Sequence, residues 1–467
     1  MVKAERLGDI RGFIGGLYGP DLHARRVDAL AGATLGVMTG ASLAVSMIGQ
    51  ALAQARGLVT RHAVKQVDRL MSNAGIDVWD SFARWVPRQV GAQPNILVAM
   101  DWTDFDHDSQ STPGSKSPGL VTGHGRAAPL IWLTVWKEEI ATRRNDYEDA
   151  FLRRLAETMP PDCRVTILAD RGFGDQKLFA FLGELGFGYV IRFRGNIRVA
   201  SADGEMRPAA EWVGKGGRAR KLRDARVTAQ GRQVGAVVCV HAKGMKEPWC
   251  LAASDPDATA AVLVNHYARR WTIEPGFRDT KDLRFGMGLS STRIGEPTRR
   301  DRLLLVSAFA MALLTLLGTV GESLGMDRQL KSNTSKTRSH SLFRQGCMLY
   351  ELIPNMPEHR LAPLIAAFAN LITHLAQPPW RRYEPRTRAW AEDGDGTQRG
   401  SVPEKAERGR IRTTVRHRGA VPGGGGRVTM ARWVRVPGVA FRHSCDSPKP
   451  AVRGADFCPG SCDSPFA

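Results

Sequence analysis

The stretch RVTILADRGFGDQKLFAFLGELGFGYVIRFRG, residues 164–195, decides the fold class. It begins with Arg164–Asp170, a run rich in Val, Ile and Leu that is typical of a buried strand. The segment QKLFAFLGELG has a helical pattern, and GYVIRFRG is again strand-like. Strands that alternate with helices in this way predict an α/β domain built around a mixed sheet.

Two further strands are expected upstream. NILVAMDWTDF, which starts at Asn95, and APLIWLTVWK (Ala128–Lys137) are rich in Val, Ile and Leu, and a helical segment, DYEDAFLRRLAETM, separates the second from residue 164. Residues 1–92 space their apolar side chains by three and four, with a break at Asn73–Gly75, which predicts a helical region.

The pattern downstream changes twice. Residues 197–249 are Gly-rich and basic with short alternating segments, which predicts a β-rich insertion, and Cys250–Ser254 returns to the main sheet. Residues 291–377 are helical again. Residues 378–467 are dominated by Pro, Gly and Arg without apolar periodicity, so we expect this tail to be disordered.

One short stretch, YARRWTIEPGFRDTKD, carries a group of polar side chains. On an ideal helix, Tyr267, Arg270, Glu274 and Lys281 fall within about 60° of one another. A carboxylate beside two cations and a phenol could hold a metal ion next to a phosphate. Pro275 directly follows Glu274, and a kink there would turn Lys281 away from this face, so two placements of Lys281 stay open.

Two more acids follow apolar strand-like runs: Asp101 in NILVAMDWT and Asp170 in VTILADRG. Three carboxylates with a phosphate-binding face indicate metal-dependent chemistry on nucleic acid. Alternation places Thr103 on the face of Asp101 and Asp104 on the other, which favours Asp101 as the ligand. Plain structural roles stay open: Asp170 as a helix cap, Asp101 as a strand end, and Glu274 as an i, i+4 partner of Arg270.

Composition points to a polyanionic partner and a reducing compartment. The chain has 467 residues with a net charge of +20 and a pI near 10.2, which favours binding to phosphates. Its seven cysteines have no zinc-type spacing and read as reduced thiols. The apolar run Leu303–Gly318 is shorter than a bilayer requires, and the N-terminus lacks a signal-type core, so a buried helix of a non-secreted protein is predicted.

Four motifs together carry a resemblance to a known family. They are D-x-T at Asp101–Thr103, DRGFGD at Asp170–Asp175, YVIRFRGN at Tyr189–Asn196, and the Y-R-E-K spacing described above. Over residues 60–350 the chain resembles a bacterial DDE transposase with the Y-R-E-K signature, of the insertion sequence 4 family. The resemblance implies an RNase H-like catalytic core over residues 93–290, with a DNA-binding region at 1–92 and a candidate dimerisation region at 291–377.

The resemblance also implies a chemistry and its residues. Asp101, Asp170 and Glu274 would hold two Mg²⁺ ions, with Mn²⁺ as a substitute, for cleavage at inverted terminal repeats and strand transfer into target double-stranded DNA. A homodimer in a synaptic complex would perform this cut-and-paste transposition. Tyr267, Arg270 and Lys281 would bind phosphate at the transposon end. Trp249 is the candidate platform for a flipped base, and a buried role in the insertion is its alternative.

Other interpretations remain open. Residues Thr60, Arg61, His62, Lys65 and Arg69 form a basic edge that is either an end-recognition surface or an ordinary solvated helix face. The whole chain could be an RNase H-like nuclease without strand transfer, or a decayed or domesticated DNA-binding protein without catalysis. The basic tail departs from the family pattern and favours the last of these. In every case we expect a cytoplasmic, nucleoid-associated protein with no membrane partner.

Overall fold

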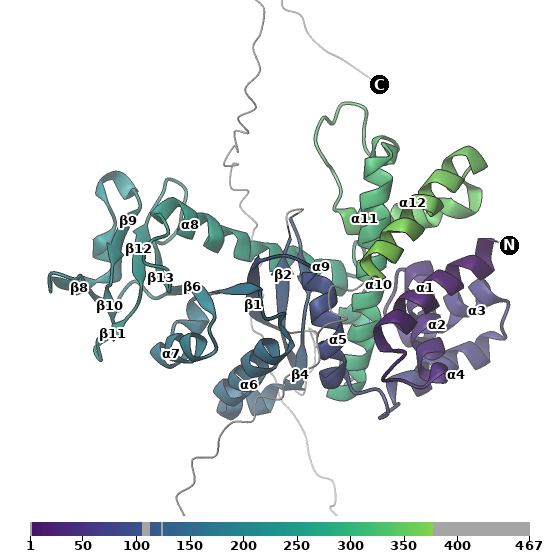
Figure 1. Ribbon diagram of the computed structural model, residues 1–467, viewed down its shortest axis with the longest axis horizontal. Coiled ribbons are helices and arrows are strands. Elements are labelled where there is room, and N and C mark those ends of the chain that lie inside the picture. The colour runs from purple at the N-terminus through teal and green to yellow at the C-terminus, as the bar shows by residue number, and fades with distance from the viewer. Residues whose placement is uncertain (1, 105–112, 123–124, 377–467) are drawn as a thin grey trace, which may run out of the picture. The chain divides into compact units, whose positions relative to one another are not determined.

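The computed structural model describes residues 2–104, 113–122 and 125–376. The tail expected to be disordered, residues 378–467, lies outside this range. Within the described ranges the protein is a mixture of helices and strands, with helices at both ends and a mixed sheet between them (Figure 1). The α/β character predicted from the alternating segments is therefore confirmed.

The main sheet is built around three parallel strands. These are β1 (Asn95–Asp104), β5 (Arg164–Ala169) and β6 (Gly188–Phe193). On the β1 side the antiparallel strands β2 (Pro113–Val121), β3 (Ala127–Pro129) and β4 (Leu133–Trp136) follow. On the β6 side lie β13 (Trp249–Ala253), β12 (Ala236–Val240) and β9 (Arg220–Arg223), also antiparallel.

One predicted strand is divided and another was not predicted. Ala128–Lys137 was expected to form a single strand, but it forms β3 and β4, separated by Leu130–Trp132. The backbone of these three residues leaves the strand pairing, and their side chains are all buried in the core. β2 pairs with both pieces and escaped prediction because its sequence, PGSKSPGLV, is made largely of Pro, Gly and Ser.

Two helices follow strands of the main sheet. α6 (Lys137–Thr158) lies between β4 and β5, and α7 (Gln176–Glu184) connects β5 to β6. Between β5 and α7 a short 3-10 turn, Arg171–Phe173, carries the DRG motif. The core of this region includes Phe151, Leu152 and Leu155 of α6, which are fully buried. α6 is longer than the predicted helix because a polar segment that ends at a kink at Arg143 precedes the predicted part.

The predicted β-rich insertion is present, but it is divided between two sheets. A separate four-stranded sheet contains β7 (Arg198–Ala200), β8 (Met206–Pro208), β10 (Arg226–Val227) and β11 (Arg232–Gln233). The strands β9 and β12 instead extend the main sheet beyond β13, and Trp212 is buried among these strands. The return of Cys250–Ser254 to the main sheet is confirmed, because β13 pairs with β6.

The N-terminal region is helical, as predicted. Its helices are α1 (Val2–Tyr18), α2 (Ala24–Gly40), α3 (Val45–Arg56), α4 (Thr60–Met71) and α5 (Val78–Val90). Two of them, α1 and α5, contact the aromatic ring of Phe309 in α10 (Pro297–Ser323). The ring centroid of Phe309 is 5.8 Å from that of Tyr18 and 5.4 Å from that of Trp85. This aromatic cluster joins the first helices of the chain to a helix that follows the sheet.

The long apolar helix α10 is the one described helix that could cross a membrane by its length and composition, and 72% of its most apolar window is buried inside the protein. The bent pair α2 and α3, at 95°, is a second candidate by the same test. Burial of this extent favours the predicted core helix. The chain continues through α11 (Leu342–Leu352) and α12 (Glu358–Ala376). Short 3-10 turns lie at Ala209–Trp212, Lys215–Gly217, Leu289–Ser291, Met326–Leu330 and Ile353–Asn355.

The Y-R-E-K segment is not a single regular α-helix. It consists of α8 (Ala260–Ala268), a 3-10 turn at Arg269–Thr272, and α9 (Ile273–Lys281). Pro275 lies in the first turn of α9, where its missing N–H costs nothing, and the irregular turn precedes it because proline clashes with the carbonyl four residues earlier. The break therefore falls before Glu274, and not between Glu274 and Lys281 as expected.

Candidate active site

Asp101 lies near the end of β1 and is largely enclosed. Its side chain is 22% exposed, and its Oδ2 is 3.3 Å from Arg270 Nη1. Its Oδ1 accepts a hydrogen bond of 2.9 Å from the backbone N–H of Trp102. Burial raises the pKa of Asp101 to about 6, with Arg270 opposing the rise and the charges of Asp170 and Glu274 adding to it. An enclosed carboxylate with two acidic neighbours is poised to bind a cation.

Asp170 reaches the same place from the neighbouring strand. β1 and β5 are parallel, and Met100 pairs with Ala169, so Asp101 and Asp170 are the next residues along the two strands. Asp170 Oδ1 also accepts a hydrogen bond of 2.8 Å from the Gly172 N–H at the start of the 3-10 turn. The capping role considered from the sequence is therefore real, and it fixes the side chain beside Asp101.

Glu274 comes from α9 and is the most exposed of the three acids, at 48%. Its Oε1 is 3.7 Å from Arg270 Nη2. Burial raises the pKa of Glu274, the cations Arg270 and Arg278 oppose the rise, and the charge of Asp170 adds to it. Because Asp170 and Glu274 raise the pKa of Asp101, and Asp170 raises that of Glu274, the three predicted carboxylates are close enough to interact electrostatically.

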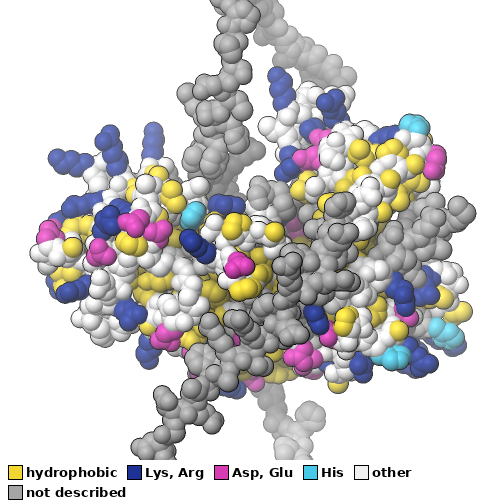
Figure 2. Space-filling model, in the orientation of Figure 1, with side chains coloured by type: hydrophobic (Ala, Val, Ile, Leu, Met, Phe, Trp, Pro, Cys, Tyr) yellow, Lys and Arg dark blue, Asp and Glu magenta, His cyan; other side chains and the backbone are white. Residues whose placement is uncertain are grey.

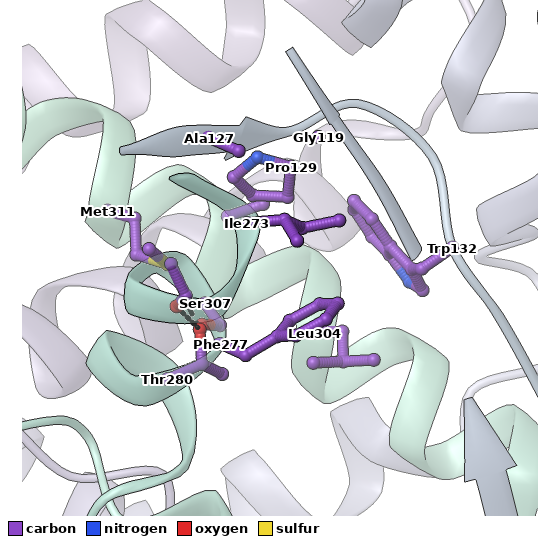
Figure 3. Close-up of a pocket in the computed structure, with 12 residues that line it drawn as sticks. Gly119, Ala127, Pro129, Trp132, Ile273, Phe277, Thr280, Leu304, Ser307 and Met311 are labelled. Atoms are coloured by element: carbon purple, nitrogen blue, oxygen red, sulfur yellow. Dashed lines mark hydrogen bonds between the residues drawn. The ribbon is translucent and has the colours of Figure 1, made fainter. Parts of the chain in front are cut away.

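The opposite face of α9 anchors it to the core and so positions Glu274. Ile273, Gly276, Phe277 and Thr280 recur at helical spacing and line a small apolar pocket between α9, α10 and the strands β2 and β3 (Figure 3). Gly276 lies against β3 so closely that an added Cβ would be 2.9 Å from the Ala127 carbonyl oxygen. The close approach requires glycine at this position.

Arg270 lies between two of the acids. Its side chain is 6% exposed, and it forms ion pairs with Asp101 on one side and Glu274 on the other. Its guanidinium carbon is 4.8 Å from the ring centre of Trp271 and 6.0 Å from that of Tyr267. The i, i+4 pairing with Glu274 considered from the sequence exists, and the contact with Asp101 adds a long-range partner.

Lys281 lies on the site face, and the displacement by a kink at Pro275 does not occur. Its Nζ donates a hydrogen bond of 2.9 Å to Thr103 Oγ1 and another to the Asp104 carbonyl oxygen. The irregular turn precedes Glu274, so the eight residues from Glu274 to Lys281 stay on one regular helix. The Asp104 carboxylate faces Lys137 instead, at 3.4 Å, which agrees with the predicted alternation along β1.

Two aromatic residues proposed to touch DNA lie deeper. Tyr267 is only 1% exposed, and its ring meets that of Trp249 edge to face at 4.9 Å. Trp249, at the start of β13, is partly buried against the same apolar cluster. The Tyr267 ring lies beside the Arg270 guanidinium, and Trp249 packs against Tyr267, so neither ring lies fully open on the surface.

Two arginines near the acids were not assigned from the sequence. Arg171 of the DRG motif and Arg192 of β6 both contact Glu247 Oε2, at 2.9 and 2.8 Å. The Arg192 side chain is 16% exposed, and its Nε is buried without a hydrogen-bond partner. Both residues lie within the motifs DRGFGD and YVIRFRGN, which was a usable signal. Two guanidinium groups sharing one carboxylate oxygen form an arrangement that also suits a phosphate.

The acids have the right chemistry for divalent ions but are not assembled as a metal site. Within the described ranges, no three His, Cys, Asp or Glu side chains are close enough together to form one. The guanidinium of Arg270 stands between Asp101 and Glu274. The donor set nevertheless fits Mg²⁺ or Mn²⁺, because carboxylate oxygens, which these ions prefer, come from three elements, and Asp170 and Glu274 both act on Asp101 electrostatically.

Basic surfaces lie away from the acids. The basic edge predicted on α4 is exposed along its length at Thr60, Arg61, His62, Lys65 and Arg69. Figure 2 shows Lys and Arg side chains gathered over the β-rich insertion. The exposed cations of that segment are Arg198, Lys215, Arg218, Arg220, Arg223, Arg226, Arg232, Lys243 and Lys246. They outnumber the exposed acids there, so this surface carries net positive charge.

A comparison with known families points to the same chemistry. Residues 94–311, just under half of the chain, match the model of a family described as the transposase DDE domain. The matched region begins at β1, ends within α10, and contains all three acids. No curated protein gives a significant match to the chain. The family match supports a DDE transposase.

Proposed function

We propose that this protein is a DNA transposase in which Asp101, Asp170 and Glu274 form the metal-binding active site. The observation that carries the proposal is their convergence from β1, the end of β5, and α9 within the region matching the transposase DDE domain. The three parallel strands with antiparallel flanks support an RNase H-like core over residues 93–290.

The three carboxylates would hold two Mg²⁺ ions, or Mn²⁺ in their place. When bound, such ions activate the attacking oxygen and stabilise the leaving oxygen of a phosphodiester. Arg270 and Lys281 lie beside the acids and would bind the phosphates that flank the scissile bond. Trp249 packs against Tyr267, whose ring lies beside Arg270. Contact between Trp249 and a flipped base would therefore require a rearrangement on DNA binding.

The rest of the molecule would bind DNA away from the scissile bond. The exposed basic edge of α4 is proposed to recognise inverted terminal repeats, and the basic insertion to bind the backbone non-specifically. Cut-and-paste transposition by a homodimer in a synaptic complex, with residues 291–377 in dimerisation, completes the proposal. We also propose that the protein belongs to the insertion sequence 4 family and that it is cytoplasmic and associated with the nucleoid.

The direct test uses DNA from both sides of the gene. Labelled duplexes that carry the flanking sequences are incubated with full-length protein and Mg²⁺, Mn²⁺ or a chelator, and the cleaved ends are mapped. We expect metal-dependent nicks at matched inverted repeats, and joining of the freed 3′ ends to a target plasmid. Cleavage at scattered positions without joining would indicate a nuclease, and binding without cleavage in either metal would indicate a decayed DNA-binding protein.

A further inference from the structure

The negative charge of the acidic site is compensated internally by one buried arginine. Arg270 is 6% exposed and contacts Asp101 Oδ2 and Glu274 Oε1 at 3.3 and 3.7 Å. These are oxygens of the two carboxylates that the proposed function assigns to metal binding. The cation nearest to both acids in this structure is therefore a protein side chain.

A guanidinium and a divalent ion compete for such a position. Both are attracted by the same carboxylates, and they repel each other strongly at separations of a few ångströms in an enclosed site. Arg270 carries a single positive charge and contacts one oxygen of each of the two carboxylates, so it offsets only part of their negative charge. Removal of Arg270 from the acids should therefore strengthen metal binding considerably.

Arg270 is held between the acids by two ion pairs that leave part of its guanidinium group unsatisfied. Its Nε is buried without a partner, so its present hydrogen bonding is incomplete. The guanidinium lies 4.8 Å from the ring of Trp271, which is 46% exposed, so one neighbour of Arg270 is open to solvent. A phosphate offers the guanidinium two oxygens at once, whereas each acid presents only one to it here.

We propose that Arg270 is an internal counter-ion that keeps Asp101 and Glu274 occupied until DNA binds, so that DNA precedes metal in the order of binding. A DNA phosphate takes the guanidinium, the two carboxylates are released, and the site then accepts divalent ions. This ordering rests on the proposed function. It would restrict metal-dependent cleavage to protein that already holds DNA.

The test measures metal affinity without any cleavage. Mn²⁺ is titrated into full-length protein in the absence of DNA, and free Mn²⁺ is followed by electron paramagnetic resonance. We expect Arg270→Gln to bind Mn²⁺ about tenfold or more tightly than the wild type, since one competing charge is removed. Arg278→Gln is the matched control, because it removes an exposed cation that also lowers the pKa of Glu274 from the same helix. Its affinity should change by less than about threefold.

A second arm keeps the inference testable if Arg270→Gln folds poorly. A 30-base-pair duplex added to the wild type should raise Mn²⁺ affinity, and Asp101→Asn should abolish that gain. Equal affinity in the wild type with and without duplex, or an equal gain in the Arg270 and Arg278 variants, would overturn the ordering. Wild-type cleavage is measured in parallel. Cleavage without the expected changes in Mn²⁺ affinity would reject only the order of binding. Mn²⁺ affinity that is the same in Asp101→Asn and the wild type would reject the proposed active site.

Discussion

At the scale of single residues, the acids are distinguished by their surroundings more than by their identity. Asp101 is enclosed beside two other carboxylates, and burial raises its pKa to about 6, whereas Asp104, three residues on, faces Lys137 at an exposed position. Burial and neighbouring acids disfavour the ionised form unless a cation is present. The contrast supports Asp101 as the ligand of the two.

Substitution of each acid gives the first prediction. Asp101→Asn, Asp170→Asn and Glu274→Gln should each reduce metal-dependent cleavage by at least about a thousandfold. Each substitution keeps the shape of the side chain but removes the negative charge that binds the metal ion. Binding to flanking-sequence duplexes, measured by fluorescence anisotropy, should stay within about threefold of the wild type, because the acids hold metal and not DNA. Asp104→Asn is the control, and it should cleave normally. Any one variant that retains cleavage is removed from the proposed triad.

The shared carboxylate of Glu247 gives the second prediction. Glu247→Gln should tighten DNA binding by several fold and steepen its salt dependence by about one phosphate contact, because Arg171 and Arg192 lose a competing anion. Glu211→Gln is the control, since Glu211 is an exposed acid of the same insertion. An equal increase in DNA affinity in both variants would show that the effect comes from net charge alone. An unchanged DNA affinity in Glu247→Gln would show that the two arginines do not contact DNA.

At the scale of elements, the position of Glu274 depends on how α9 packs. The helix carries its site residues on one face and Ile273, Gly276, Phe277 and Thr280 on another, where they line the pocket of Figure 3. The segment before α9 is a 3-10 turn that contains Arg270. Any shift of α9 therefore moves Glu274 and Lys281 relative to the strands that carry the other acids.

Gly276 provides the third prediction. Gly276→Ala should lower the free energy of unfolding by about 1–3 kcal/mol and reduce cleavage, because the new Cβ must displace α9 from the Ala127 carbonyl. Gly183→Ala in α7 is the control: nothing lies within 4 Å of a Cβ there, so it should be neutral or stabilise by up to about 1 kcal/mol. Urea denaturation and cleavage assays measure both quantities. Unchanged stability and cleavage in Gly276→Ala would mean that this contact does not set the position of α9.

At the scale of the whole molecule, α10 joins the helical regions to the sheet. Phe309 packs among aromatic rings of the first helices, and Asp301, near the start of α10, contacts β4. Thr134 donates to Asp301 Oδ1 through its backbone N–H at 3.1 Å and its hydroxyl at 2.6 Å. Burial raises the pKa of Asp301 to about 7, with the Thr134 hydrogen bonds opposing the rise.

Asp301 gives the fourth prediction. Its carboxyl ionises near 3.8 in the unfolded chain and near 7 in the folded protein, so between these values the folded protein binds a proton that the unfolded chain has lost. The stability from this group is full below about pH 4 and is lost as the pH rises through 7. Asp301→Asn cannot ionise and keeps an acceptor for Thr134, so we expect it to be more stable than the wild type by about 1–3 kcal/mol at pH 8. The difference should shrink as the pH falls to 5.

Denaturation at the two pH values measures this difference. Asp257→Asn is the control, because its side chain is 80% exposed and should show no such dependence. A wild type that equals or exceeds Asp301→Asn in stability at pH 8 would show that the Asp301 carboxylate is stabilised, and not penalised, in the folded protein.

Local pattern was enough to predict much of this protein. Runs of Val, Ile and Leu identified β1, β5 and β6, and spacing by three and four identified the helical ends, because both signals depend on which side chains must avoid water. The acids Asp101, Asp170 and Glu274 were found because each stands at a strand end or in a polar helical stripe. The division of Ala128–Lys137 and the Pro- and Gly-rich strand β2 were missed, since their strand structure depends on pairing with other segments.

The chain's own sequence thus determined the α/β class, the basic character and the three acids, because these follow from local periodicity and residue chemistry. Tertiary structure alone decided what stands between the acids. Arg270 meets Asp101, which is 169 residues away in the chain, and Glu247 joins Arg171 to Arg192. Such contacts depend on how the strands and α9 pack. An ion pair between residues far apart in the chain produces no repeating pattern in the sequence, so it cannot be predicted from periodicity.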